Sequence, residues 1–199
     1  MNVLGFSEGF HDAGICLLKN DRIYFASHSE RHSRKKGDKW IHPTQLPKSK
    51  LNKPDIIAYY EKPFRKNLRR LYAGQKWQKP RRKYDMYFGH HECHAAAGYY
   101  TSSFDECNVL VIDAIGEWDT VSLWKCTYDN KMKKIMTWKY PHSLGLLYSA
   151  ITQRIGLKPN EDEYITMGMS AFGEPKYDLS DLLWNNNHKG VGNIYPKAE

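Results

Sequence analysis

Short apolar runs separated by polar turns open the chain, which is the pattern of a β-meander. This pattern predicts three strands, over residues 2–7, 14–19 and 22–29. A polar turn at 8–13 joins the first two, and the apolar run 55–60 predicts a later buried strand. Because short strands precede segments of helical period, we expect an α/β fold with a mixed sheet rather than a doubly wound parallel sheet.

A second meander is predicted further along, and helices flank it. The expected strands cover residues 108–112, 120–126 and 134–139, with a hairpin turn at 129–130. We expect a helix over about 91–100, and a helical apolar period predicts another over 143–155 that ends at Gly156. Beyond residue 177 we expect a short amphipathic helix and then a loop-like tail.

The composition is that of a folded chain. Of the 199 residues, 41% are hydrophobic and 14% aromatic, which excludes a disordered protein. The four cysteines form no Cys-x-x-Cys pair, so they favour neither a disulfide framework nor a zinc ribbon. No apolar stretch reaches the 18 or so residues of a membrane span, and a strand rather than a secretory leader is predicted at the start. We therefore expect a cytoplasmic protein without a membrane partner.

Positive charge is concentrated in one stretch. The net charge is +8, and residues 62–83 contain ten lysines or arginines and no acid, interleaved with aromatic residues such as Trp77. Such clusters contact phosphates, and aromatic rings can stack on bases, so this stretch is the best nucleic-acid candidate. The alternative is a solvated surface helix and loop, which the absence of a recognised nucleic-acid-binding motif favours.

A histidine-rich segment, residues 89–98, indicates a metal site. His90 and His94 are four residues apart, so on a helix they share a face and can direct two imidazoles at one ion. Asp113 follows a predicted buried strand, and its carboxylate could complete a set of ligands suited to iron, zinc or manganese. An ordinary polar helix face is the alternative. A metal hydrolase using Glu92 is disfavoured, because the spacing is not that of His-Glu-x-x-His zinc enzymes.

Two glycine-containing turns could serve a nucleotide and an acceptor. Residues 9–14 place His11 and Asp12 between two strands, where a histidine beside a carboxylate can act as a general base. Gly116 and Glu117 lie in a similar turn after Asp113. Two such turns suit a nucleotide held between hairpins with a metal on its phosphates, although a plain hairpin with a solvated histidine is the alternative for the first.

Six segments carry a resemblance to a known family. They cover residues 4–12, 29–36, 90–95, 113–118, 141–149 and 163–173. In this order they are similar to motifs of the N-terminal part of carbamoyltransferases related to nodulation-factor and aminoglycoside O-carbamoyltransferases. The resemblance extends over roughly residues 3 to 176. The chain departs from the pattern at Ile165, where the family has lysine, so any contact of that lysine is missing.

The resemblance implies an actin-like, sugar-kinase-like ATPase lobe that is incomplete. Residues 1–176 would be the N-terminal lobe and 177–199 the truncated start of the following region. A family member forms carbamoyl-adenylate from carbamoyl phosphate and ATP in a second domain, and passes the carbamoyl group to a small-molecule acceptor hydroxyl. The missing C-terminal lobe and adenylate-forming domain, in the same or a separate chain, are then required partners, and we expect this chain alone to be inactive.

The resemblance also assigns residue roles. His90, His94 and Asp113 would hold a divalent metal, iron by carry-over, against the nucleotide phosphates. His11 would be the base that takes the acceptor's proton. The residues expected to bind the cofactor are Gly116, Glu117 and Lys36, with Lys36 or its neighbours near the acceptor. The alternative function is a catalytically incomplete binding module that docks on a partner chain or on nucleic acid through its basic surface.

Overall fold

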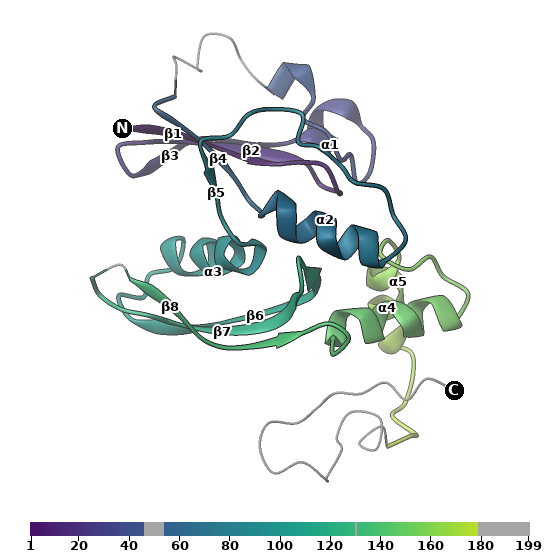
Figure 1. Cartoon of the computed structure of the whole chain (residues 1–199). Coiled ribbons are helices and arrows are strands. Elements are labelled where there is room, and N and C mark those ends of the chain that lie inside the picture. The colour runs from purple at the N-terminus through teal and green to yellow at the C-terminus, as the bar shows by residue number, and fades with distance from the viewer. Residues whose placement is uncertain (46–53, 130, 179–199) are drawn as a thin grey trace. The chain divides into compact units, whose positions relative to one another are not determined.

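The computed structural model describes residues 1–45, 54–129 and 131–178. The chain forms two compact units, Met1–Cys93 and His94–Glu199 (Figure 1). The boundary between them falls inside helix α3, His90–Tyr100, which is a single uninterrupted helix.

The first unit contains a mixed five-stranded sheet. Its strands are β1 (Asn2–Ser7), β2 (Gly14–Lys19), β3 (Arg22–His28), β4 (Ile56–Tyr59) and β5 (Met86–Tyr87), in the order β3-β2-β1-β4-β5. The first three strands pair antiparallel, whereas β4 is parallel to both β1 and β5. The predicted mixed sheet is therefore confirmed, and so are the three opening strands. The actin-like assignment stays a prediction.

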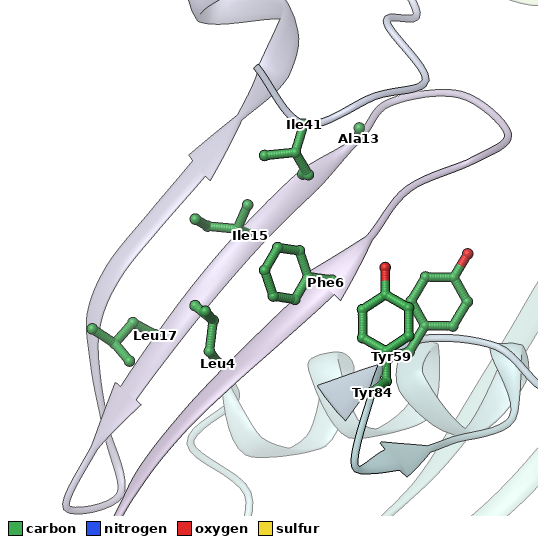
Figure 2. Packing of buried hydrophobic residues seen from close by; sticks show 8 residues of the cluster. All are labelled: Leu4, Phe6, Ala13, Ile15, Leu17, Ile41, Tyr59 and Tyr84. Atoms are coloured by element: carbon green, nitrogen blue, oxygen red, sulfur yellow. The ribbon is translucent and has the colours of Figure 1, made fainter. Parts of the chain in front are cut away.

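The core of this unit follows from period-two alternation along the strands. Leu4 and Phe6 on β1 are buried, as are Ile15 and Leu17 on β2, and they pack with Ala13, Ile41, Tyr59 and Tyr84 (Figure 2). The rings of Tyr59 and Tyr84 stack with their centroids 4.4 Å apart. Each fully buried aliphatic or phenylalanine side chain contributes about 1.5–3 kcal/mol relative to an exposed one, so this cluster is the main stabilising feature of the unit.

Short helices complete the first unit. They are α1 (Ser29–Ser33), the 3₁₀ turn η1 (Pro43–Gln45) and α2 (Pro63–Tyr72). Helix α2 begins with proline, whose fixed φ suits the first helical position. The prediction of a wholly solvated surface helix in the basic stretch is wrong at Lys66 and Asn67, which are both buried. Lys66 can be buried because it forms an ion pair with buried Glu61.

In its described residues, the second unit contains an antiparallel meander, the greater part of helix α3 and two further helices. Its strands are β6 (Cys107–Gly116), β7 (Asp119–Cys126) and β8 (Met132–Lys139). Helix α3 lies across one face of this sheet, and α4 (Leu144–Arg154) and α5 (Glu163–Ser170) follow the last strand (Figure 1). Helix α3 packs through Ala95 against Val111 and Trp124 of the sheet. This contact fixes the helix that carries the histidines.

Three further expectations concern the C-terminal helix, the cysteines and membrane spans. The predicted helix beyond residue 177 falls mostly within residues 179–199, outside the described residues. All four cysteines lie in the described part of the chain, and none is in a disulfide. A membrane span requires about 20 apolar residues in one helix, and no helix within residues 1–45, 54–129 and 131–178 has that character. The cytoplasmic location stays a prediction.

Candidate metal centre

Three predicted ligands lie together. His90 and His94 are on one face of α3, and Asp113 is on β6. One ligand atom from each lies within 4.8 Å of the other two. His90 and Asp113 are partly buried and His94 is exposed, so the group is open to solvent on one side. The helical spacing of the histidines and the packing of α3 on the sheet together account for this convergence.

The three residues fit a divalent transition metal. Two imidazole nitrogens and one carboxylate oxygen form a donor set suited to iron, zinc or manganese. Because metal–nitrogen bonds are about 2.1 Å long, two ligand atoms on opposite sides of one ion are about 4.2 Å apart and neighbouring ones are closer. The three ligand atoms lie within 4.8 Å of one another, so small side-chain adjustments are enough to bring them to bonding distance of one ion. Three protein ligands leave further positions of a six-coordinate ion available for other donors.

An irregularity in β6 positions Asp113. The ladder between β6 and β7 is regular as far as Ile112 opposite Val121, then shifts before Gly116 pairs with Asp119. Asp113 lies in this irregular segment, and its Oδ1 accepts a hydrogen bond of 2.7 Å from the N–H of Ala114. β-Bulges of this kind redirect side chains next to functional sites.

The start of α4 supports the same segment from behind. The Ser143 hydroxyl donates to the carbonyl of Ala114 at 2.6 Å, and its oxygen caps the helix by accepting from the N–H of Leu146 at 3.1 Å. Gly145 comes so close that a Cβ built on it would lie 2.6 Å from Ala114 Cα and 2.9 Å from Asp113 C. Only glycine allows this approach. The backbone carrying Asp113 is therefore held by direct contact with α4.

The residues predicted to bind the cofactor lie in two different units. Gly116 ends the β6 ladder opposite Asp119, and Glu117 follows in the turn with a φ of 59° and a buried side chain. Both are therefore in the strand and turn that carry Asp113. Lys36 is exposed in the segment between α1 and η1 of the first unit. Whether these residues contact a nucleotide stays a prediction.

The predicted base, His11, contacts the carboxylate beside it. His11 Nδ1 lies 2.6 Å from Asp12 Oδ2, and both side chains are exposed. Because a carboxylate only accepts hydrogen bonds, Nδ1 carries the proton and Nε2 is left as the basic nitrogen. Asp12 has a φ of 51°, and its other oxygen lies 3.6 Å from His28 Nε2. The pair thus has the geometry of an oriented general base.

Glu92 has a structural contact that accounts for its place in the motif. Its Oε2 accepts a hydrogen bond of 3.0 Å from the N–H of Gly89, the residue before α3. A glutamate that reaches back to the cap residue in this way is half of a capping box. The contact favours a helix-stabilising role over the general-base role of a metal hydrolase.

Two buried glutamates of the first unit were not among the candidate residues predicted from the sequence. Glu8 and Glu61 are 2% and 3% exposed. Glu8 continues the alternation of Leu4 and Phe6, and Glu61 that of Ile57 and Tyr59. Each therefore extends the core-facing side of a strand by one position. Continuing the period-two pattern past the apolar residues would have found both.

Comparisons with known proteins agree with the resemblance. Residues 57–195 match the family model for the carbamoyltransferase N-terminus. The uncharacterized protein sll1178 of Synechocystis sp. is 33% identical over 93% of this chain and 36% of its own length. The uncharacterized protein MJ1051 of Methanocaldococcus jannaschii is 32% identical over 96% of this chain and 37% of its own length. The nodulation protein NolNO of Sinorhizobium fredii is 26% identical over 93% of this chain and 31% of its own length.

The chain spans about a third of the length of these relatives. The matched region includes helix α3, strand β6 and the start of α4, which together form the candidate metal centre. Since the family model covers well over half of the residues, the chain belongs to the carbamoyltransferase family and corresponds to its N-terminal region.

Proposed function

We propose that this chain is the N-terminal part of an ATP-dependent O-carbamoyltransferase that transfers a carbamoyl group from carbamoyl-adenylate to an acceptor hydroxyl. The observation that carries the proposal is the convergence of His90, His94 and Asp113, whose ligand atoms lie within 4.8 Å of one another. The family match supports the reaction class, because the model is that of the carbamoyltransferase N-terminus. Carbamoyl phosphate is the proposed donor, and the remainder of the enzyme is the proposed partner.

In the proposed reaction, His11 acts on the acceptor. Its Nε2 takes the proton of the acceptor hydroxyl while the hydroxyl oxygen attacks the carbamoyl carbon. The bond between that carbon and the phosphate oxygen of the adenylate breaks, so the products are a carbamate ester and AMP. The Asp12 carboxylate, 2.6 Å from His11 Nδ1, orients the imidazole and stabilises the imidazolium that forms.

The metal centre would act on the nucleotide. A divalent ion, which we propose to be iron, would offset negative charge on the phosphates. His90, His94 and Asp113 would hold it, and the hydrogen bond from Ala114 N to Asp113 Oδ1 would orient the carboxylate ligand. Gly116 and Glu117 are proposed as neighbours of the nucleotide because they continue the strand that carries Asp113. In the first unit, Lys36 is the residue proposed to bind the cofactor.

The test separates the two parts of this mechanism. In the complete enzyme, supplied with carbamoyl phosphate and ATP, His11→Ala should abolish transfer to the acceptor while carbamoyl-adenylate still forms. The matched control is His42→Ala, which removes another histidine of the same unit that lies outside the six family motifs. His90→Ala and His94→Ala should each reduce transfer by at least about tenfold together with metal content. Unaltered transfer by the His90→Ala/His94→Ala double variant would disprove the proposal.

A further inference from the structure

Two cysteines of the second unit lie opposite each other on neighbouring strands. Cys107 begins β6 and Cys126 ends β7, and the two are partners in the antiparallel ladder. The pairing continues without a shift from these cysteines to Ile112 opposite Val121. Because directly opposite residues project their side chains from the same face of a sheet, the two sulfurs face one another. The proposed carbamoyl transfer gives neither cysteine a role.

The spacing of such a pair suits a disulfide bond. Opposite residues on antiparallel strands have Cα atoms about 4.5 Å or about 5.5 Å apart, depending on the hydrogen-bond pattern. A disulfide joins residues whose Cα atoms are about 4.4–6.8 Å apart, so both spacings lie within its range. The Cys126 and Cys107 side chains are already in contact through a hydrogen bond, and both thiols are free. Closing the bond therefore requires side-chain rotation and little movement of the strands.

The two thiols differ in their access to solvent. Cys126 is 1% exposed, whereas Cys107 is only partly buried. Burial raises the pKa of Cys126, and its contact with Cys107 raises this pKa further, so Cys126 remains a thiol at neutral pH. An oxidant dissolved in water therefore meets Cys107 first. Cys126 is placed behind it, where its sulfur can attack an oxidised Cys107.

A tyrosine of α3 holds the two strand ends together. The Tyr99 hydroxyl donates its proton to the carbonyls of Asp105, at 2.8 Å, and Thr127, at 2.9 Å. Asp105 is two residues before Cys107, and Thr127 directly follows Cys126. Tyr99 is 4% exposed, so water competes little for these hydrogen bonds. The thiols are thus held opposite each other by noncovalent contacts before any covalent bond forms.

We propose that Cys107 and Cys126 form an oxidative modification site, a dithiol pair that a peroxide converts to a disulfide. The Cys107 thiolate attacks one oxygen of hydrogen peroxide, the O–O bond breaks, and the leaving hydroxide takes up the proton that Cys107 lost. The sulfur of Cys126 then attacks the sulfur of the Cys107 sulfenic acid, the S–O bond breaks, and hydroxide leaves with the Cys126 proton as water. Two thiols and one peroxide thus give one disulfide and two water molecules.

The disulfide would act within the second unit. It would enclose residues 107–126, which include both strands of the β6–β7 hairpin. A cross-link of this kind stabilises mainly by constraining the unfolded chain, so the oxidised protein should be more stable than the reduced one. The bond is reversible, since thiol reductants open it by exchange. The inference does not depend on the proposed carbamoyl transfer and can be tested without it.

The experiment treats the chain with hydrogen peroxide at about pH 8, then alkylates the remaining thiols in urea and measures the mass. We expect the number of alkylated thiols to fall from four to two, with a peptide map that shows Cys107 joined to Cys126. In the folded chain this pair should exceed any other cysteine pair at least about tenfold, whereas the urea-unfolded chain should give mixed pairings. Dithiothreitol should restore the thiols, and the oxidised chain should unfold at a higher urea concentration than the reduced chain.

Alanine variants test the two roles separately. In Cys126→Ala the sulfenic acid of Cys107 has no partner, so dimedone should label Cys107 at least about tenfold more than in the wild-type chain. In Cys107→Ala the buried Cys126 should remain a thiol at peroxide concentrations that oxidise the wild-type chain. The matched control is Cys16→Ala, because Cys16 is also partly buried but lies on β2 of the first unit. It should form the disulfide as fast as the wild-type chain, and circular dichroism shows whether each variant is folded.

The peptide map of the wild-type chain decides the question even if an alanine variant does not fold. The proposal would be overturned if the folded chain gave the same mixture of cysteine pairs as the urea-unfolded chain. It would equally fail if peroxide converted Cys107 to a sulfinic acid while Cys126 stayed a thiol, or if Cys16→Ala prevented the disulfide as completely as Cys107→Ala.

Discussion

Replacing Gly145 with alanine tests how α4 supports the metal centre. The new Cβ would lie 2.6 Å from Ala114 Cα, 2.7 Å from Ala114 N and 2.9 Å from Asp113 C. Ordinary carbon–carbon contacts are about 3.5–4.0 Å, so helix and strand must separate by about 1 Å. All three atoms are backbone, so no side-chain rotation can relieve the clash.

The cost can be worked out from these contacts. Overpacking of this kind destabilises by about 1–3 kcal/mol. Separation would also stretch the 2.6 Å hydrogen bond from Ser143 to Ala114, at a cost of about 0.5–1.5 kcal/mol. Alanine gains up to about 1 kcal/mol of helix propensity over glycine, which offsets part of the loss. We expect a net destabilisation of about 1–3 kcal/mol.

The assay combines urea denaturation with metal titration. Gly145→Ala should lower the free energy of unfolding and weaken binding of Fe²⁺ or Mn²⁺ by about tenfold or more, because Asp113 moves with its backbone. The matched control is Gly168→Ala on α5, where a Cβ would meet no atom within 4 Å. It should leave metal affinity unchanged and stabilise by up to about 1 kcal/mol. The reasoning is refuted if Gly145→Ala is as stable as the wild-type chain and binds metal equally well.

Three further predictions concern buried polar groups. Lys66→Met should destabilise the first unit by about 3–5 kcal/mol in urea denaturation, because it leaves the Glu61 carboxylate buried without its cation. Adding Glu61→Leu should restore most of the lost stability. An unchanged denaturation midpoint for Lys66→Met would contradict the account. Burial raises the pKa of Tyr84 in the folded state, so the unfolded chain loses this proton first as pH rises above about 10. The stabilisation by Tyr84 is therefore complete below pH 10, and above it the free energy of unfolding falls by up to about 1.4 kcal/mol per pH unit. Between about pH 9.5 and 11.5 the free energy of unfolding of Tyr84→Phe should fall less steeply than that of the wild-type chain. Parallel plots of unfolding free energy against pH for the two proteins would rule this out. Ser143→Ala should lower the free energy of unfolding by about 1 kcal/mol, because the helix cap is lost, and it should weaken metal binding in the same titration. An unchanged metal affinity would show that the contact with Ala114 does not support Asp113.

Local patterns predicted much of the fold. The opening strands are where alternation and turn residues place them, and the histidine helix begins within one residue of the expected position. The convergence of His90 and His94 follows from helical spacing alone. That Asp113 joins them depends on how α3 packs on the sheet. Sequence periodicity does not specify such packing: the position of Asp113 after a predicted strand made it a candidate ligand, and the order of the family motifs supported that assignment.

Contacts between different elements explain what the sequence did not show. The basic composition of residues 62–83 favoured a solvated helix, and it hid the burial of Lys66. Its partner Glu61 is only five residues earlier, but the burial of Glu61 follows from the alternation of strand β4 and not from the helix. The tight approach of Gly145 to Ala114 joins segments about thirty residues apart. Burial of a charged or small residue depends on a partner elsewhere in the chain, which local propensity does not contain.

The central claim is that two imidazoles and one carboxylate hold a single divalent ion. X-ray absorption spectroscopy of the Fe²⁺-loaded chain measures this ligand set directly. We predict one bound iron per chain with two imidazole nitrogens among its ligands, one of which is lost in His94→Ala while circular dichroism shows the helix content preserved. A spectrum with no imidazole scattering, or one identical in the wild-type chain and in His94→Ala, would contradict the account.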